Sequence, residues 1–367
     1  MASGDPVIDG KTTDLVNCVN VKASPYNALG NGSNDTTAFN SAIAVANASK
    51  ATLFIPAGIY DITPGSMTIV ETNIDGPYAT LRAYTAADSP LLRVENYAAI
   101  ENHQFIRLRA LAGYGSNGSD QYNPATKHGY GLYFGTDHVR GGRFDIQYIN
   151  GFTGGIFLDS ASVNKHIASM KFRIGYIIGN TYGILLRSGN ADSATPEASR
   201  FEVEYMRQNT VNIWLDGSAG LYIPSNSFDI TCMELHQQAG DIGFYLSGSN
   251  VYQNTFKVNG SFVTGTGYAI VADGAHDNRF ELSYLPFNKI NMTAGNVLDQ
   301  RTTEVGYPGP VAGRARSQVM DSAAPTVAYW RAGDICWNTN PASGVLLWVA
   351  RANGVGAAAN WGTVNVN

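Results

Sequence analysis

A short pattern of apolar and polar residues recurs through the middle of the chain at nearly even spacing. Each copy starts with a phenylalanine, continues with a charged residue and then has a β-branched or aliphatic residue, as in FDIQY, FRIGY and FEVEY. Successive copies are 28, 29, 27, 28 and 24 residues apart, and their phenylalanines are Phe144, Phe172, Phe201, Phe228, Phe256 and Phe280. Because apolar and polar residues alternate within each copy, the pattern predicts β-strands with the phenylalanine on the buried side.

A second strand pattern keeps step with the first. Its copies read GLYFG, GIFLD, GILLR, NIWLD, GFYLS and AIVAD and start at residues 131, 155, 183, 212, 243 and 269. Two strand patterns that repeat together every ~27 residues are typical of a solenoid, and no amphipathic helix of a leucine-rich or TPR repeat accompanies them. The sequence therefore predicts an all-β protein, a right-handed single-stranded parallel β-helix. Phenylalanines stacked about 4.8 Å apart would form a ladder inside its core.

The regions outside these repeats complete the expected organisation. A short helix should start near Asn34 and Asp35 and bury Phe39 and Ile43, so that it covers the open N-terminal end of the solenoid. The expected parts are a lead-in and N-terminal cap at 1–62, the β-helix body at 63–300, a linker at 301–330, and a small C-terminal β module for trimerisation or capping at 331–367.

Net charge, cysteine content and apolar runs each exclude some partners or cellular settings. The net charge is −5, which argues against nucleic acid, because binding to phosphates needs a basic surface. Cys18, Cys232 and Cys336 are too few and too scattered for a disulfide framework or a zinc site, so we expect reduced thiols. No apolar run is long enough to cross a membrane, and MASGDPVIDG has neither the basic nor the apolar segment of a signal peptide. We therefore expect either that a leading segment was removed or that the protein leaves its cell by another route, such as lysis.

Segments near both ends of the chain resemble known proteins. ALGNGSNDTTAF and FIPAGIY, within residues 24–62, are similar to the opening of the pectate-lyase-like β-helix superfamily, and in particular to its bacteriophage tailspike and polysaccharide depolymerase group. GDICWNTNPASGVLLWV at 333–349 resembles a short β-module that often trails phage tail proteins. The resemblance implies a homotrimer in a virion tail or outside the cell, which contacts other tail proteins and cleaves a bacterial capsular or surface polysaccharide.

The predicted register brings charged side chains into columns on the outside of the solenoid. The column directly after the phenylalanines alternates in sign except at one junction, and it reads Asp145, Arg173, Glu202, Asp229, Lys257 and Glu281. At that junction Glu202 should face Asp229 across about 5 Å, with Glu204 alongside in the next column. No basic residue of these two columns relieves all three carboxylates.

A carboxylate group of this kind fits glycoside hydrolysis. That reaction needs one carboxyl as acid and another, ionised, as nucleophile or base. We hypothesise that Glu202, Asp229 and Glu204 are catalytic, with Asp229 as base or nucleophile and a glutamate as acid. Spacing of about 5 Å between adjacent rungs would suit a retaining mechanism, and a diagonal Glu204–Asp229 spacing of roughly 7–8 Å an inverting one. The plainer interpretation is that these acids point into solvent or bind an adventitious cation.

A lyase that works by β-elimination is the alternative on the same fold. It needs a base near a uronate and a cation that neutralises the uronate carboxylate. The basic groups near this face, which we assign to substrate binding, are Arg173, Lys257, Arg207 and His236. A glycan-binding spike without catalysis is a third alternative. The sequence has no GxSxG, HExxH or P-loop motif, so neither a metal nor another cofactor is expected.

The second strand pattern has outward columns of its own. One of them reads Tyr133, Phe157, Leu185, Trp214, Tyr245 and Val271. Outward aromatic side chains on consecutive rungs predict either a carbohydrate platform, with Trp214 and Tyr245 as sugar-binding residues, or an interface between subunits, which we favour. The neighbouring column alternates in sign, is expected to be structural, and reads Asp159, Arg187 and Asp216.

Overall fold

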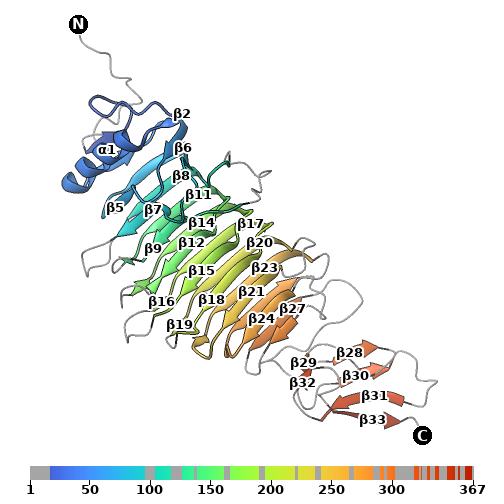
Figure 1. Ribbon diagram of the computed structural model, residues 1–367. Coiled ribbons are helices and arrows are strands. Elements are labelled where there is room, and N and C mark those ends of the chain that lie inside the picture. The colour runs from blue at the N-terminus through green and yellow to red at the C-terminus, as the bar shows by residue number, and fades with distance from the viewer. Residues whose placement is uncertain are drawn as a thin grey trace, which may run out of the picture.

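The protein is an elongated stack of strands with a helix at one end (Figure 1). The structure is a computed structural model, and the residues that it describes are 17–95, 104–116, 126–135, 139–160, 166–189, 195–219, 222–235, 241–263, 268–283, 290–292, 296–301, 318–321, 324, 329–330, 335–338, 345–351, 354–355 and 360–365. Successive rungs pair in parallel through these residues, which confirms the predicted parallel β-helix.

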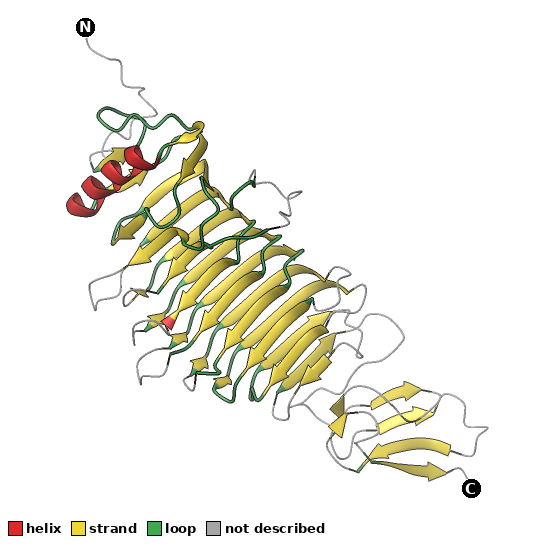
Figure 2. Cartoon of the chain, viewed as in Figure 1, coloured by secondary structure: helices red, strands yellow, loops and turns green. Residues whose placement is uncertain are grey.

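Helix α1 (Thr36–Ser49) caps the N-terminal end of the solenoid, as predicted (Figure 2). Phe39, Ala42, Ile43 and Ala46 form its buried side. The helix follows a tight turn, in which the carboxylate of Asp35 accepts the backbone N–H groups of Leu29 and Gly30 at 2.7 and 3.0 Å. Gly30 has φ +64°, and a Cβ there would lie 2.7 Å from the ring of Tyr60, so only glycine fits. The ALGNGSND segment therefore forms the turn that leads into helix α1.

The largest wall of the solenoid is a parallel sheet, sheet A, which has thirteen strands among the described residues. From β11 to β25 its strands carry the phenylalanine pattern in the predicted register. The strands are β1 (Cys18–Asn20), β2 (Asn31–Asn34), β3 (Thr52–Phe54), β4 (Gly58–Ile62), β6 (Ile74–Ala83), β8 (Phe105–Ala112), β11 (Arg143–Asn150), β14 (Lys171–Ile178), β17 (Arg200–Arg207), β20 (Ser227–Leu235), β23 (Thr255–Val263), β25 (Arg279–Ser283) and β27 (Val297–Arg301).

A second wall, sheet B, carries the second strand pattern and has nine strands among the described residues. They are β5 (Thr68–Val70), β7 (Pro90–Glu95), β9 (Tyr130–Phe134), β12 (Gly154–Asp159), β15 (Tyr182–Arg187), β18 (Val211–Asp216), β21 (Ile242–Ser247), β24 (Tyr268–Asp273) and β26 (Ile290–Met292). Short strands form a third side and are β10 (Val139–Arg140), β13 (Ile167–Ala168), β16 (Pro196–Glu197), β19 (Ile223–Pro224) and β22 (Val251–Tyr252). From β10 to β24 each rung thus crosses all three sides before the next rung begins.

The six phenylalanines of the first pattern stack inside the solenoid, as predicted. Neighbouring ring centroids are 4.5–5.0 Å apart and neighbouring ring planes differ by 1–20°. Each of these rings is at most 1% exposed. From sheet B, Phe134 and Phe244 meet the stack at steep angles, with centroids 5.0–5.8 Å away. Sheets A and B therefore share one core, and their other faces point to opposite sides of the solenoid.

Buried asparagines form a second ladder, at the corner that leads into sheet A. Its members are Asn226, Asn254, Asn278 and Asn296. The backbone N–H of each of the first three donates to the side-chain oxygen of the asparagine on the next rung, at 2.9–3.2 Å. The Nδ2 of each donates to the same oxygen at 3.0–3.1 Å. The ladder satisfies backbone groups that the corner would otherwise bury without partners.

We expect Asn254→Ala to lower the free energy of unfolding by about 3 kcal/mol, because it leaves several buried groups without partners. The lost side chain accepts a bond from Asn226 and donates to the backbone oxygens of Ile223 and Tyr252. Urea denaturation measures the loss. The control, Asn259→Ala, removes an exposed side chain of the same rung and should cost less than about 0.5 kcal/mol. Equal losses in the two variants would contradict the role of the ladder.

Beyond residue 317 the described strands form small sheets of their own. In one of them β28 pairs with β30 in parallel, and β30, β31 and β33 pair antiparallel, around a small core that contains Cys336 and Trp348. Its first strand lies within the residues that we expected to form the linker. The strands are β28 (Gln318–Asp321), β29 (Tyr329–Trp330), β30 (Ile335–Asn338), β31 (Val345–Ala350), β32 (Gly354–Val355) and β33 (Trp361–Asn365).

Two further expectations concern membranes and thiols. In the part of the chain that the structure describes, no helix combines the length and the apolar character needed to span a bilayer. Cys18, Cys232 and Cys336 form no disulfide within the described residues.

Candidate functional site

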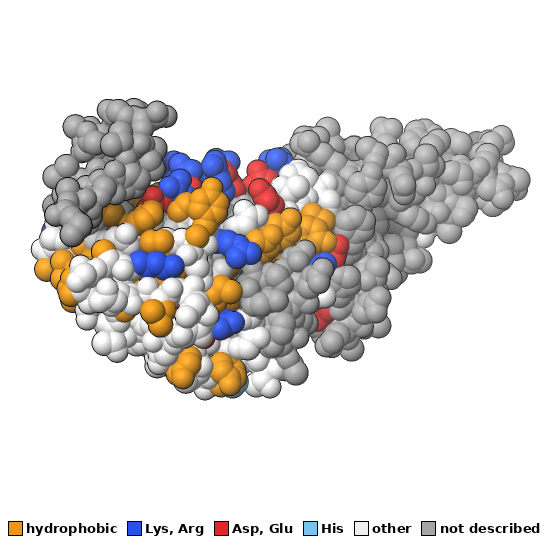
Figure 3. Space-filling view, turned by 90° about the horizontal axis from the view of Figure 1, so that it is seen from above, with side chains coloured by type: hydrophobic (Ala, Val, Ile, Leu, Met, Phe, Trp, Pro, Cys, Tyr) orange, Lys and Arg blue, Asp and Glu red, His pale blue; other side chains and the backbone are white. Residues whose placement is uncertain are grey.

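A column of charged side chains runs along the outer face of sheet A. The strand register places its members on successive rungs, and they are Asp75, Arg107, Asp145, Arg173, Glu202, Asp229, Lys257 and Glu281. The last six are the predicted column, in the predicted order. Figure 3 shows Lys and Arg side chains gathered beside Asp and Glu side chains on one face of the protein. Asp75 and Arg107 were missed because their strands lack the phenylalanine that marks the register.

Glu202 on β17 and Asp229 on β20 are direct neighbours across adjacent rungs, as the sequence predicted. Each carboxylate has basic partners. Glu202 lies 2.8 Å from the guanidinium of Arg200 and 3.6 Å from that of Arg173. Asp229 lies 3.6 Å from the Nζ of Lys257. Arg200 lies outside the two predicted columns: it stands two residues before Glu202, so its side chain leaves the strand on the same side.

Glu204, the third predicted carboxylate, stands apart from these ion pairs. It lies two residues after Glu202 on β17, so both side chains point outward. The side chain of Glu204 is exposed and has neither an ion pair nor a hydrogen bond within the described residues. It is therefore the one of the three carboxylates that no cation holds in place.

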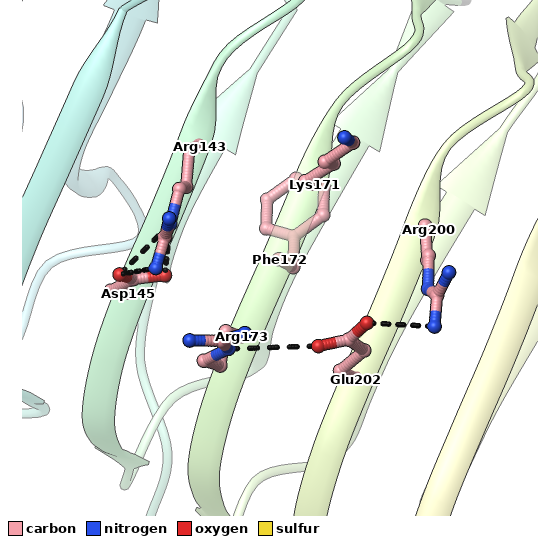
Figure 4. A pocket seen from close by; sticks show the side chains of 7 residues that line it. All are labelled: Arg143, Asp145, Lys171, Phe172, Arg173, Arg200 and Glu202. Carbon is pink, nitrogen blue, oxygen red and sulfur yellow. Dashed lines mark hydrogen bonds and ion pairs between the residues drawn. The ribbon is translucent and has the colours of Figure 1, made fainter.

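A cavity of about 220 Å³ opens on the same face, across β11, β14 and β17 (Figure 4). Its lining residues are Arg143, Asp145, Lys171, Phe172, Arg173, Arg200 and Glu202. Arg143 binds the carboxylate of Asp145 at 2.8 Å, on the same strand. The cavity thus brings together two predicted site residues, Arg173 and Glu202, with basic residues that sequence reasoning had not selected.

A column of tyrosines lies further along the same strands. Tyr148 and Tyr176 stack with centroids 4.9 Å apart, and Tyr205 follows at 5.9 Å. The hydroxyl of Tyr205 donates a hydrogen bond to Glu234, and the guanidinium of Arg207 lies 5.7 Å from the Tyr205 ring centroid. Burial, and after it the bond to Glu234, raise the pKa of Tyr205. The predicted Arg207 therefore belongs to this tyrosine column, and not to the cavity.

Trp214 and Tyr245, the predicted sugar-binding aromatics, lie on sheet B, on the wall opposite the carboxylates. Their rings stack with centroids 5.5 Å apart, and the ring of Tyr182 lies 5.0 Å from that of Trp214 at an angle of 50°. The indole N–H of Trp214 donates to the hydroxyl of Ser247 at 3.0 Å. The structure therefore does not bring these two residues together with Glu202 and the other carboxylates.

The outward aromatic column of sheet B is more covered than its sequence indicated. Phe157 is 1% exposed and Leu185 is 5% exposed, although both point away from the core. Phe157 packs against the rings of Tyr130 and Tyr133, and the guanidinium of Arg187 lies 4.9 Å from its centroid. Side chains of this same chain thus cover the middle of the column, which the sequence pattern alone could not reveal.

Asp159, Arg187 and Asp216 stand on successive rungs in the predicted register, and Arg187 forms an ion pair with Asp159. Arg187 binds Asp159 with two hydrogen bonds, at 3.0 and 2.7 Å, and the carboxylate is almost fully buried. The bond to Asp159 raises the pKa of Arg187. The guanidinium and the hydroxyl of Tyr133, which donates to Asp159 at 3.2 Å, therefore supply polar contacts that this buried carboxylate needs.

We expect Arg187→Met to lower the free energy of unfolding by about 2 kcal/mol, because it leaves Asp159 buried without its cation. The expected loss lies below that of a fully buried pair, since 41% of the Arg187 side chain is exposed. Urea denaturation measures it. Arg107→Met is the matched control, because its pair with Asp75 is exposed, and it should cost less than about 1 kcal/mol. The pair of Arg187 and Asp159 is not structural if both variants unfold alike.

Two other expectations concern histidine and metals. His236, which we assigned to substrate binding, lies outside the described residues. Across the described ranges, no group of three or more His, Cys, Asp or Glu side chains could hold a metal ion.

The fold and this face define a parallel β-helix protein with a charged outer wall. No protein-family model matches the chain, and no curated protein matches it. It is similar to the solved Dettilon tailspike protein, at 12% identity and a TM-score of 0.46, over 83% of this chain and 66% of that chain. It is also similar to the A-module of the mannuronan C-5 epimerase AlgE4 of Azotobacter vinelandii, at 16% identity and a TM-score of 0.25, over 80% of this chain and 100% of that chain. The chain thus spans just under two thirds of the tailspike.

Proposed function

We propose that this protein binds and cleaves a bacterial surface polysaccharide by glycoside hydrolysis on the outer face of sheet A. The observation that carries the proposal is the register of Glu202 and Asp229 on adjacent rungs, with Glu204 beside them. The wall on which they stand has thirteen strands among the described residues, so an extended polymer can lie along it. Ion pairs with Arg200 and Lys257 fix the two carboxylates before the substrate arrives.

The ion pairs suggest how the roles divide. Glu204, which no cation holds, acts as the acid and gives its proton to the oxygen of the leaving sugar. Asp229 acts as the base: it takes a proton from a water molecule, whose oxygen attacks the anomeric carbon while the glycosidic bond breaks. Glu204 and Asp229 are diagonal neighbours, and a separation of roughly 7–8 Å leaves room for that water. The proposed mechanism is therefore inverting.

A polysaccharide lyase is the second candidate, and the pair of Tyr205 and Glu234 favours it. A tyrosine hydroxyl bonded to a carboxylate can exchange protons with a sugar, and basic residues such as Arg173 can neutralise a uronate beside it. This pair lies on β17 and β20, the two strands that carry Glu202 and Asp229. The two candidates therefore share one face and predict different products.

The proposed setting is a homotrimeric spike of a virion tail, outside the host cell, that also contacts other tail proteins. The ALGNGSND and FIPAGIY segments support it through their resemblance to the tailspike group. Trp214 and Tyr245 support the trimer, because they are half-buried aromatics on the wall opposite the proposed site. In this arrangement sheet B faces the neighbouring subunits and sheet A faces the polysaccharide.

Incubation with purified capsular polysaccharides tests the proposal. We expect the size of one polymer to fall and its reducing ends to increase, without the ultraviolet absorbance of an unsaturated uronate. Appearance of that absorbance would identify a lyase instead. Retained binding with unchanged polymer size would identify a non-catalytic glycan-binding spike and contradict the enzymatic proposal.

A further inference from the structure

The cavity on sheet A is strongly basic, although the whole chain is acidic. Its lining has four cations and two carboxylates, which gives the cavity a net charge of +2. The cations are Arg143, Lys171, Arg173 and Arg200. The chain as a whole carries −5, so this local excess does not follow from composition. A concave site with an excess of cations favours an anionic ligand.

Three of these cations stand directly above one another. The register aligns Arg143, Lys171 and Arg200 on β11, β14 and β17, about 4.8 Å apart. Like charges at this spacing destabilise a sheet by a few tenths of a kcal/mol for each pair. The fold therefore tolerates a repulsive column at the place where the cavity opens.

On the two strands next to β14, a carboxylate neutralises the cation of this column. On β11, Arg143 binds Asp145 two residues later, at 2.8 Å. On β17, Arg200 binds Glu202 two residues later, at the same distance. Arg143 and Arg200 thus each have a carboxylate of their own strand.

Strand β14 breaks this arrangement. Two residues after Lys171 it has Arg173 in place of a carboxylate, so one strand presents two cations side by side. The side chain of Lys171 is exposed and has neither an ion pair nor a hydrogen bond within the described residues. In Figure 4 no dashed line reaches Lys171, whereas dashed lines join Arg143 to Asp145 and Arg200 to Glu202. The carboxylate missing from β14 leaves a place for an anion between the two neighbouring rungs.

We propose that this cavity binds the anionic group of an acidic sugar residue, with Lys171 and Arg173 as its principal donors. The inference rests on the proposed function and adds the substrate class: the polysaccharide is acidic. Lys171 lies one rung from Glu202 and two rungs from Asp229, about 10 Å from the proposed base along the solenoid. An anionic group held there would fix the position of the polymer along the carboxylate column.

Binding to three polymers of known charge tests the inference. The probes are polygalacturonate, dextran sulfate and uncharged dextran, measured by titration calorimetry at fixed ionic strength because charge-driven binding depends on salt. We expect the protein to bind an anionic polymer and not dextran. Preference for polygalacturonate identifies a carboxylate ligand, and preference for dextran sulfate identifies a sulfate. Equal binding of all three polymers, or of none, would overturn the inference.

Substitution of Lys171 tests whether the anion binds at this place on the sheet. Lys171→Met should weaken anionic-polymer binding about tenfold, because a hydrogen bond to a charged group is lost, and Lys171→Arg should restore most of it. Arg279→Met is the matched control, since it removes one cation of the same column four rungs away and should change the affinity less than twofold. Equal weakening by Lys171→Met and Arg279→Met would mean that no specific pocket exists.

The outcomes for this inference and for the proposed function are separable. Cleavage of a neutral polysaccharide at a rate that Lys171→Met does not change would refute the anion pocket and leave the hydrolase intact. Anionic binding that depends on Lys171, without cleavage of any polymer, would support the pocket and refute the hydrolase.

Discussion

Asp229→Asn should reduce the rate of polysaccharide cleavage by about 10²–10⁴-fold, which is the usual contribution of a general base. The amide keeps the shape of the side chain but cannot accept a proton from water. Asp229 lies on the outer face of β20, with Lys257 beside it, so the substitution leaves the core unchanged. The rate at which reducing ends form measures the loss, and the affinity for intact polymer should change less than tenfold.

Glu281→Gln is the matched control for this prediction. Glu281 stands in the same column two rungs away, where it binds Arg279 at 2.7 Å. The control removes a carboxylate of the same face and should retain at least half of the cleavage rate. Cleavage by Asp229→Asn at the rate of the control would exclude Asp229 as the base.

Phe201→Ala should lower the free energy of unfolding by about 3–5 kcal/mol, because it leaves a cavity in the middle of the phenylalanine stack. The ring of Phe201 is fully buried, and its centroid lies 4.5 Å from that of Phe172 and 4.8 Å from that of Phe228. The stacking contacts on both sides are lost together with the buried area. The next residue, Glu202, should also lose its fixed position, so cleavage should fall as well.

Urea denaturation measures this loss, and Phe105→Ala controls for it. Phe105 is on sheet A too, but it is only partly buried and begins β8 in the column of Arg143. Its removal should cost less than about 1.5 kcal/mol. Similar losses in the two variants would show that the stack adds nothing beyond ordinary apolar contact.

The sequence predicted the architecture because the phenylalanine pattern is local and repeats. Once Phe172, Phe201 and Phe228 are aligned, the register of every neighbouring residue follows, and Glu202 opposite Asp229 is one consequence. The rungs before residue 130 have no such marker, so the sequence did not reveal that Asp75 and Arg107 extend the charged column.

The basic cavity escaped the sequence analysis for a different reason. Arg143, Lys171 and Arg200 each stand directly before a phenylalanine, and this column was not compared across rungs. The column of three cations could be read from the sequence. The ion pairs within a strand could not, because they depend on side-chain conformations that a register alone does not give. The same limit explains Phe157, which points outward and is buried because Tyr130 and Tyr133 fold over it.

The most direct test of the account is mass spectrometry of the material that the protein releases from the polysaccharide of its bacterial host. The account predicts a series of oligosaccharides spaced by one repeating unit, each with the added mass of one water, and no such series with Asp229→Asn. Fragments that lack the mass of water would contradict hydrolysis. An unchanged polymer, or the same series from Asp229→Asn, would contradict the proposed site on sheet A.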